Sequence, residues 1–380
     1  AYSITGQTMS DGNPVPGDHD GMAAFPGPDG TFLVVRNHEL SPGENEAGNT
    51  DGVIVPDAMK HDTGATGGTS NLVFTNDGEL ISHFNTLGGT IRNCAGGPTP
   101  WGTWISCEED VRLPEGDITQ RHGYNFEVPA NATGPVQAVP LVAMGRFNHE
   151  ACAVDPVSGH VFQTEDRGDS CFYRFRPTTP GDLSAGVLEA LVVSGEPNLD
   201  TGSGQLTRLG IPMDVAWVTI NEVDPAADTI RDEAQSKGAA TFVRGEGAWY
   251  GNGLIYFVCT SGGDAGAGQV WAYDPAAQTL TLVVESTDAN ELESPDNITV
   301  GPADRLYLCE DGGGQQFIVG VEPNGVLFQI ARNALDNSEF AGACFSPDGR
   351  FMLVNSQGLG VTYLIEGPWR EAIHSDGFEA

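Results

Sequence analysis

The sequence predicts an all-β fold, and the preferred architecture is a six-bladed β-propeller with loop insertions and little helix. Glycine accounts for 51 and proline for 24 of the 380 residues, whereas charged residues make up only 18%. This composition is rich in turns and unlike that of a helical bundle. Turn signals such as Pro28-Asp29-Gly30 and Pro347-Asp348-Gly349 recur along the chain. Most of them are followed at once by a β-rich run, which is typical of an all-β protein.

Six short apolar runs support the propeller, because each stops abruptly at acidic or metal-capable side chains. The runs lie roughly 45 to 95 residues apart, and one four-stranded blade needs about 40–50 residues. The inner strands of a propeller all point at a central channel, so these strand ends would meet on one face. A two-sheet sandwich or jelly roll is the alternative, because the repeat is irregular. The runs are Phe32–Val35, Trp104–Ile105, Val161–Phe162, Leu254–Val258, Leu306–Leu308 and Phe351–Val354.

We expect one domain over residues 1–380, since no linker or low-complexity segment marks a boundary. One stretch, at about 221–240, is predicted to be a partly helical insertion. Pro225 near its start and Gly238 after its end are the residue types expected to flank a helix over Ala226–Lys237.

The charge balance limits the possible partners. Acidic residues outnumber basic residues 52 to 17, for a formal net charge of −35. Such a surface disfavours nucleic acid and anionic membranes but suits cations. No apolar run approaches the ~20 residues of a membrane span. The chain starts at Ala1 without Met, so we expect a mature periplasmic or secreted protein, and we expect it to be a monomer.

The densest candidate segment is Asn93–Glu109, in which glycines, prolines and two tryptophans precede Cys107, Glu108 and Glu109. Carboxylates repel one another and are costly to bury unpaired. Delivering several of them from matching strand ends therefore indicates a multivalent cation. A thiolate beside carboxylates suits iron or zinc next to a harder ion.

A second block contains His149 and Glu150, followed by Glu165 and Asp166. The turn at Asp155–Gly159 would return the chain, so that both acidic groups lie at one end of a sheet. His149 could serve as a metal ligand, a proton donor or a phosphate contact.

Two further blocks add a cation and more carboxylates. Arg244 stands two residues before Glu246, and arginine offers the natural fork for a phosphate or carboxylate. Asp296 and Asn297, followed by Asp311, provide the carboxylate and amide oxygens typical of Ca²⁺ sites.

At these blocks the chain resembles the PhoX-type alkaline phosphatases and their short relatives. The resemblance runs in order through nearly the whole chain, and the Trp-Gly-Thr-Trp string that leads to Cys107-Glu108-Glu109 is its most specific part. The matching segments are Arg36–Glu39, Gly67–Phe74, Asn93–Glu109, Gly145–Glu150, Gly159–Phe175, Glu246–Gly263, Ser294–Gly313 and Ala341–Pro368.

The resemblance implies a propeller whose central face holds two oxo-bridged ferric ions and two or three calcium ions. It also implies hydrolysis of small-molecule phosphate monoesters by an oxygen nucleophile that the iron–calcium cluster activates. Cys107 resembles the iron thiolate, and Arg244 resembles the phosphate-binding arginine. His149 or Asn93 would add a hydrogen bond. The carboxylates that resemble metal ligands are Glu39, Glu108, Glu109, Glu150, Glu165, Asp166, Glu246, Asp296 and Asp311, with Glu108 or Glu109 and Glu165 or Asp166 left open.

The chain departs from the large family members in being much shorter, and in carrying Gly245 where they often have proline. Two other functions fit a propeller with a central calcium ion. One is a calcium-dependent lactonase or esterase, and the other is a non-catalytic binding propeller that calcium stabilises. Cys107 and Arg244 discriminate against the lactonase, which has no use for either residue. The binding propeller is distinguished by a metal-dependent melting temperature without hydrolysis of any ester.

Overall fold

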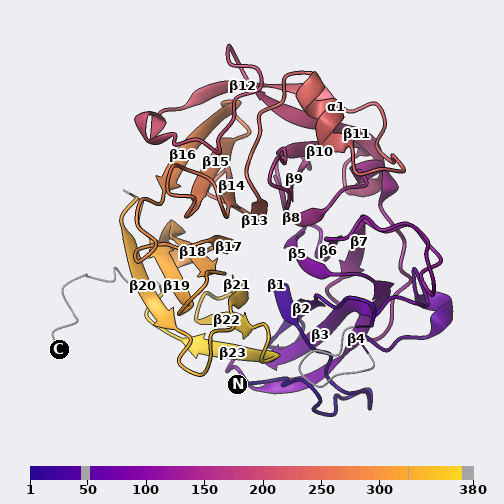
Figure 1. The fold of residues 1–380 in the computed structure, drawn as a ribbon. Coiled ribbons are helices and arrows are strands. Elements are labelled where there is room, and N and C mark those ends of the chain that lie inside the picture. The colour runs from indigo at the N-terminus through magenta and orange to yellow at the C-terminus, as the bar shows by residue number, and fades with distance from the viewer. Residues whose placement is uncertain (44–51, 324, 370–380) are drawn as a thin grey trace.

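The computed structural model describes residues 1–43, 52–323 and 325–369, and over these residues the fold is all-β with a single α-helix. The sheets stand side by side around a common centre (Figure 1). The chain therefore forms a ring of sheets and not two facing layers.

The first half of the ring contains two sheets and most of a third. A four-stranded sheet comprises β1 (His19–Pro26), β2 (Thr31–His38), β3 (Gly67–Thr75) and β4 (Leu80–Thr90). A three-stranded sheet comprises β5 (Asn93–Pro98), β6 (Thr103–Glu108) and β7 (Asn125–Pro129). The next strands are β8 (His149–Val154), β9 (Val161–Glu165), β10 (Tyr173–Thr179), β11 (Asp182–Val193) and β12 (Met213–Thr219).

The second half continues the same pattern. Strands β13 (Gly245–Gly251), β14 (Leu254–Cys259), β15 (Gln269–Asp274) and β16 (Thr279–Glu285) join β8–β12 in one nine-stranded sheet through the β12–β16 pairing. A four-stranded sheet comprises β17 (Pro295–Val300), β18 (Leu306–Glu310), β19 (Phe317–Val321) and β20 (Leu327–Arg332). The last sheet comprises β21 (Phe340–Phe345), β22 (Phe351–Ser356) and β23 (Val361–Glu366).

In the described part of the chain, helical structure is confined to short segments. The helix α1 (Ile230–Ser236) lies inside the predicted insertion, but it is shorter than the predicted Ala226–Lys237. Its Ile230 and Ala234 are buried, and Gly238 follows it with a φ of 95°. The other helical segments of residues 1–43, 52–323 and 325–369 are the 3-10 helices Asp57–Met59, Val142–Met144, Leu206–Arg208 and Pro302–Asp304. Among the described residues, no helix has the length and apolar character needed to cross a membrane.

The innermost strands close the ring. Strands β1, β5, β8, β13, β17 and β21 surround the centre in Figure 1, and each contacts the next, with β21 in contact with β1. The N-terminal segment completes the last sheet, because Tyr2 bridges Thr362 of β23, and its N–H donates to the Thr362 carbonyl at 2.7 Å. Buried Arg36 adds to this closure by donating to Thr362 Oγ1 at 2.7 Å and to Ser70 Oγ at 3.0 Å.

One register repeats around the ring. In each innermost hairpin, the first residue of the inner strand pairs with the last residue of the second strand. A register shift follows this first pair in five hairpins and the second pair, Ala341 with Asn355, in the sixth. Such β-bulges redirect the side chains beside them. The equivalent pairs are His19 with His38, Asn93 with Glu108, His149 with Glu165, Gly245 with Cys259, Pro295 with Glu310, and Phe340 with Ser356.

Candidate functional site

The repeated register places two sets of side chains at one end of the ring. The second residues of the inner strands β1, β5, β8, β13 and β17 are Asp20, Cys94, Glu150, Glu246 and Asp296. The residues that directly follow β2, β6, β9, β18 and β22 are Glu39, Glu109, Asp166, Asp311 and Gln357.

All ten of these residues line a single cavity of about 290 Å³, together with Asp18, Arg92, Arg244 and Glu339. The cavity is strongly acidic, because its carboxyl groups far outnumber the guanidinium groups of Arg92 and Arg244. We call it the acidic cavity. Its ten carboxyl groups belong to Asp18, Asp20, Glu39, Glu109, Glu150, Asp166, Glu246, Asp296, Asp311 and Glu339.

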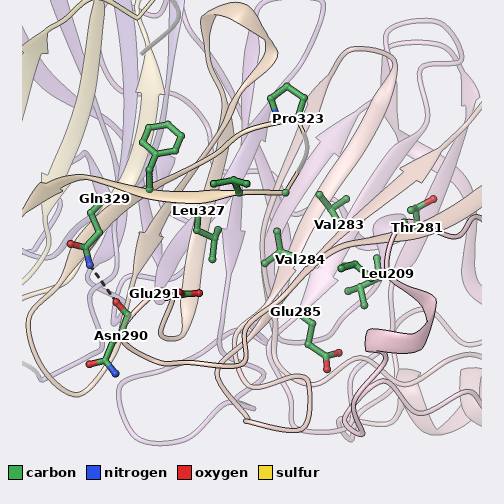
Figure 2. A pocket seen from close by; sticks show the side chains of 15 residues that line it. Leu209, Thr281, Val283, Val284, Glu285, Asn290, Glu291, Pro323, Leu327 and Gln329 are labelled. Atoms are coloured by element: carbon green, nitrogen blue, oxygen red, sulfur yellow. Dashed lines mark hydrogen bonds between the residues drawn. The ribbon is translucent and has the colours of Figure 1, made fainter. Parts of the chain in front are cut away.

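A larger cavity of about 1020 Å³ lies at the outer rim, between β16 and β20 (Figure 2). Aliphatic side chains such as Val283, Val284 and Leu327 line it, and the carboxyl groups among its described lining residues are Glu285 and Glu291. Glu285 Oε2 already accepts hydrogen bonds from the Gln205 N–H at 2.8 Å and from Gln269 Nε2 at 2.7 Å. The described lining of the outer cavity therefore offers no convergent reactive groups, and the acidic cavity is the candidate functional site.

One wall of the acidic cavity gathers a thiol and two carboxylates. Cys94, Glu109 and Glu150 each offer a ligand atom, and these atoms lie within 4.8 Å of one another. Cys94 Sγ donates to the His149 carbonyl at 3.6 Å. Burial raises the pKa of the Cys94 thiol well above its usual value, and the charges of Glu150 and Glu109 raise it further. A bound cation would reverse this effect, and a thiolate with carboxylates suits iron or zinc.

A second group offers oxygen ligands alone. Carboxylate oxygens of Asp296, Asp311 and Glu339 also lie within 4.8 Å of one another. Burial raises the pKa of Asp296 to about 7, and the charge of Asp311 contributes to this rise. An all-oxygen set with several carboxylates is the type that Ca²⁺ prefers.

Glu150 and Glu246 also have raised pKa values. Burial raises the pKa of Glu150 well above its usual value, followed by repulsion from Asp296 and Glu109. The pKa of Glu246 is raised in the same way, first by burial and then by Asp166. Two arginines cannot neutralise this many acidic groups, so the donor set fits bound multivalent cations that supply the missing positive charge.

The two arginines of the cavity are held in unusual backbone conformations. Arg244 has a φ of 53° and Arg92 a φ of 46°, in the left-handed region that non-glycine residues rarely adopt. The Arg244 N–H donates to the Arg167 carbonyl at 2.9 Å, and its own carbonyl accepts from the Thr260 N–H at 2.9 Å. Strained backbone of this kind is concentrated at functional sites.

Carboxylates of the cavity fix the arginine side chains. Arg244 donates from Nε and Nη2 to the two oxygens of Asp166, at 2.8 and 3.1 Å, and from Nη2 to Glu246 Oε1 at 2.6 Å. Arg92 Nη2 bridges Glu39, at 2.5 Å, and Glu109. The guanidinium of Arg244 is thus held in one orientation by two carboxylates of the cavity.

The sequence left open whether Glu108 or Glu109, and whether Glu165 or Asp166, belongs to the site. The structure places only one residue of each pair at the cavity, because neighbouring residues along a strand point to opposite faces. Glu109 and Asp166 line the cavity, whereas Glu108 and Glu165 are buried elsewhere. Glu108 accepts from the Ile91 and Gly123 N–H groups, both at 2.9 Å. The carboxylate of Glu108 is therefore engaged by backbone N–H groups away from the cavity.

Glu165 is occupied in a similar way, since its Oε2 accepts from the Tyr173 hydroxyl at 2.7 Å and its Oε1 pairs with Arg231 Nη1 at 3.2 Å. Burial raises the pKa of Glu165 to about 7.

Cys107 requires a correction, since the cavity thiol belongs to Cys94. Cys107 is fully buried in a hydrophobic cluster with Phe147 and Cys152. Its pKa is raised well above the usual value by burial and by the neighbouring Cys152 thiol. Cys107 stands on β6, whereas the inner strand of the same sheet is β5, and Cys94 has the position on β5 that Glu150 has on β8.

His149 and Asn93 do not line the cavity either. The His149 ring lies 3.6 Å from the Phe147 ring, and its Nε2 hydrogen-bonds to the Gly145 carbonyl at 3.0 Å. Burial lowers the pKa of His149 to about 3, so the ring is neutral at working pH. Asn93 donates to Ser106 Oγ at 2.9 Å and accepts from Thr90 Oγ1 at 2.6 Å. Both residues hold the starts of the inner strands that carry Cys94 and Glu150.

Six lining residues were not predicted. Asp20 and Cys94 could have been found by aligning the inner strands, because they share the position of Glu150 and Glu246. Gln357 is one of the metal-capable residues that end the sixth apolar run, although it is not among the predicted ligands. The sequence gives no comparable signal for Asp18, Arg92 and Glu339.

The profile of the family described as "Alkaline phosphatase PhoX" matches residues 2–360. The chain is similar to the solved structure of Pseudomonas fluorescens PhoX in complex with vanadate, a transition state analogue, with a TM-score of 0.69 and 17% identity, over 93% of this chain and 89% of that chain. It is also similar to the periplasmic gluconolactonase PpgL of Pseudomonas aeruginosa, with a TM-score of 0.46 and 16% identity, over 93% and 82% of the two chains. No curated protein sequence matches the chain.

The family profile covers most of the chain, and the first of these structures supports the same fold. This protein belongs to the alkaline phosphatase PhoX family.

Proposed function

We propose that this protein is a metal-dependent phosphomonoesterase whose acidic cavity holds a cluster of iron and calcium ions. The observation that carries the proposal is the acidic cavity itself, where ten carboxyl groups, one thiol and two arginines meet at the centre of the ring. Family membership supports it, as does the vanadate complex of the Pseudomonas relative, because vanadate there is described as a transition state analogue.

We assign the metals by donor chemistry. Cys94, Glu109 and Glu150 would hold iron, and Asp296, Asp311 and Glu339 would hold calcium. The family resemblance favours two ferric ions and two or three calcium ions. Multivalent cations at these groups would supply Lewis-acid activation of water and would neutralise negative charge on the phosphoryl group.

The protein's own contribution is positioning and electrostatics, which dominate phosphoryl transfer. Arg244 binds the phosphoryl oxygens with the terminal nitrogen that Asp166 and Glu246 leave unused. Asp166 sets the plane of the guanidinium by its two-point contact. Burial of Glu150 and Glu246 excludes bulk water and strengthens every charge interaction within the cavity.

We further propose that the ring is a six-bladed β-propeller forming one domain. Six inner strands in mutual contact support this count, as does their common register. In the same proposal the protein acts as a monomer outside the cytoplasm, in the periplasm or as a secreted enzyme. Light scattering tests whether the protein is a monomer, and cell fractionation tests whether it lies outside the cytoplasm.

The decisive experiment compares two cysteine variants. Cys94→Ala and Cys107→Ala are purified with iron and calcium, analysed for both metals, and assayed with a chromogenic phosphomonoester and a lactone. We expect Cys94→Ala to lose iron and phosphatase turnover together, and the matched control Cys107→Ala to keep both. The proposal fails if Cys94→Ala retains full iron and turnover, or if the wild-type protein hydrolyses only the lactone.

A further inference from the structure

A second cleft, of about 510 Å³, adjoins the acidic cavity. It is lined by Arg92, Asp110, Arg112, Asn148 and Arg167, and it shares Arg92 and Glu109 with the cavity. Asn148 links the two spaces, because its Nδ2 donates to Glu109 Oε1 at 2.9 Å and to the Asp166 carbonyl at 3.3 Å. A molecule whose phosphoryl group lies in the cavity could therefore extend into this cleft.

The concentration of guanidinium groups at this cleft contrasts with the rest of the chain. The protein has 17 basic residues against 52 acidic ones. Three of those basic residues line the cleft, and Arg244 stands in the neighbouring cavity wall. The cleft lining itself holds these three arginines and the two carboxylates of Glu109 and Asp110, so guanidinium groups are far better represented here than in the acidic cavity.

Each arginine of the cleft has one terminal nitrogen that makes no hydrogen bond to another described residue. Arg112 contacts Asp110 Oδ2 through Nε at 2.8 Å and through Nη2 at 2.5 Å. Arg167 Nε donates to Asp228 Oδ2 at 2.9 Å. Among the described residues, no hydrogen bond or ion pair uses Nη1 of Arg92, Nη1 of Arg112 or Nη2 of Arg167. Their side chains are 36%, 37% and 32% exposed, so these donors can reach a ligand.

The loop that carries Arg112 is held in place by hydrogen bonds from a buried arginine. Arg146, which is fully buried, donates from Nη2 to the carbonyls of Val111 and Arg112, and from Nη1 to the Pro225 carbonyl at 3.1 Å. The Arg112 N–H donates to Asp110 Oδ1 at 2.7 Å. Because the loop is fixed in this way, a ligand would lose little affinity to ordering it.

We propose that this cleft binds a second anionic group of the substrate, a phosphate or a carboxylate carried on the leaving group. The preferred substrates are thus phosphomonoesters with two anionic ends, and Arg112 and Arg167 determine that preference. Guanidinium groups match both anions, because their forked donors form charge-assisted hydrogen bonds to phosphate and carboxylate oxygens. This inference rests on the proposed function, which places the reacting phosphoryl group in the acidic cavity.

The test uses unreactive probes with metal-loaded protein, so that it does not depend on turnover. Calorimetry compares propylphosphonate with 3-phosphonopropionate, which adds a carboxylate, and with propane-1,3-bisphosphonate, which adds a second phosphonate. We expect the wild-type protein to bind at least one doubly anionic probe about 10-fold more tightly than propylphosphonate. The arm that shows the larger gain identifies which anion the cleft prefers.

The variants are Arg112→Gln and Arg167→Gln, and Arg208→Gln is the matched control. Arg208 pairs with Glu196 at 2.5 Å, and it does not line the cleft. We expect each cleft variant to reduce the 10-fold preference to 3-fold or less without changing affinity for propylphosphonate, and the control to keep the full preference. Thermal melting of each variant verifies folding. If Arg112→Gln is misfolded, Arg112→Lys takes its place in the test, and it should keep part of the preference because it keeps the positive charge.

Equal affinity of the wild-type protein for all three probes overturns the inference, as does a preference that survives in both cleft variants. The outcome is distinguishable from failure of the proposed function. Preferential binding of a doubly anionic probe by a protein that hydrolyses no phosphomonoester would sustain the subsite and refute the phosphatase.

Discussion

Removal of metal should make the protein less stable as the pH rises from 5 to 8. The carboxyl group of Glu109 shows why. Burial, followed by repulsion from Glu39, raises its pKa from 4.5 to about 8, although Arg92 opposes the shift. A raised pKa in the folded state means that the folded protein holds the proton more tightly than the unfolded chain does. The unfolded chain therefore binds fewer protons across this window, and the free energy of unfolding falls as pH increases.

The expected size follows from that shift. A single group with these two pKa values changes the free energy of unfolding by roughly 3 kcal/mol between pH 5 and pH 8, after allowance for the 11% exposure of the Glu109 side chain. For a chain of 380 residues, this corresponds to a fall in Tm of about 4 °C. The pKa values of Glu150 and Glu246 are also raised, so the whole cavity contributes in the same direction.

The assay is differential scanning calorimetry of chelator-treated protein at pH 5, 6, 7 and 8. Glu109→Gln should flatten the decline, whereas Glu79→Gln, at an exposed position, should not. In metal-loaded protein the decline should vanish or reverse, since bound cations keep the carboxylates ionised. A chelated wild-type protein whose Tm stays level or rises across this window would refute the electrostatic account of the cavity.

Three further predictions concern single residues. Arg244→Lys keeps the charge but loses the fork that Asp166 orients, so kcat/KM for a phosphomonoester should fall about 100-fold in steady-state kinetics; an unchanged value would remove Arg244 from the mechanism. His149→Gln should leave the shape of the pH–rate profile between pH 6 and 10 unaltered, because burial keeps the His149 ring neutral there; loss of a limb would contradict this. Arg36→Met should lower the free energy of unfolding in urea by about 2–3 kcal/mol, since the buried hydroxyls of Ser70 and Thr362 lose their donor; no change would mean that the N-terminal closure contributes nothing.

Much of the cavity was predictable because apolar runs mark where strands end. Glu39, Glu109 and Asp166 each stand four residues after the end of such a run, and the structure places all three in the cavity. It was harder to predict which of two adjacent acidic residues faces the cavity, because a shift of one residue along a strand moves a side chain to the opposite face. This is why Glu108 and Glu109, or Glu165 and Asp166, could not be separated from the sequence.

The remaining errors have identifiable physical causes. Cys107 stands next to two glutamates in the sequence, but the strand pairing brings Cys94 and Glu109 together instead. Arg92 and Asp18 reach the cavity through backbone with φ values of 46° and 44°, a conformation that the sequence does not require of either residue. The predicted helix is longer than the observed Ile230–Ser236, which starts five residues after Pro225.

Metal dependence of the reaction tests the central claim most directly. The measurement is the rate of phosphomonoester hydrolysis, followed together with the iron and calcium content of the same sample during chelation and re-addition. We predict that turnover disappears as the metals leave and returns as they are restored. Full turnover by a protein from which both metals have been removed would contradict the proposed role of the acidic cavity.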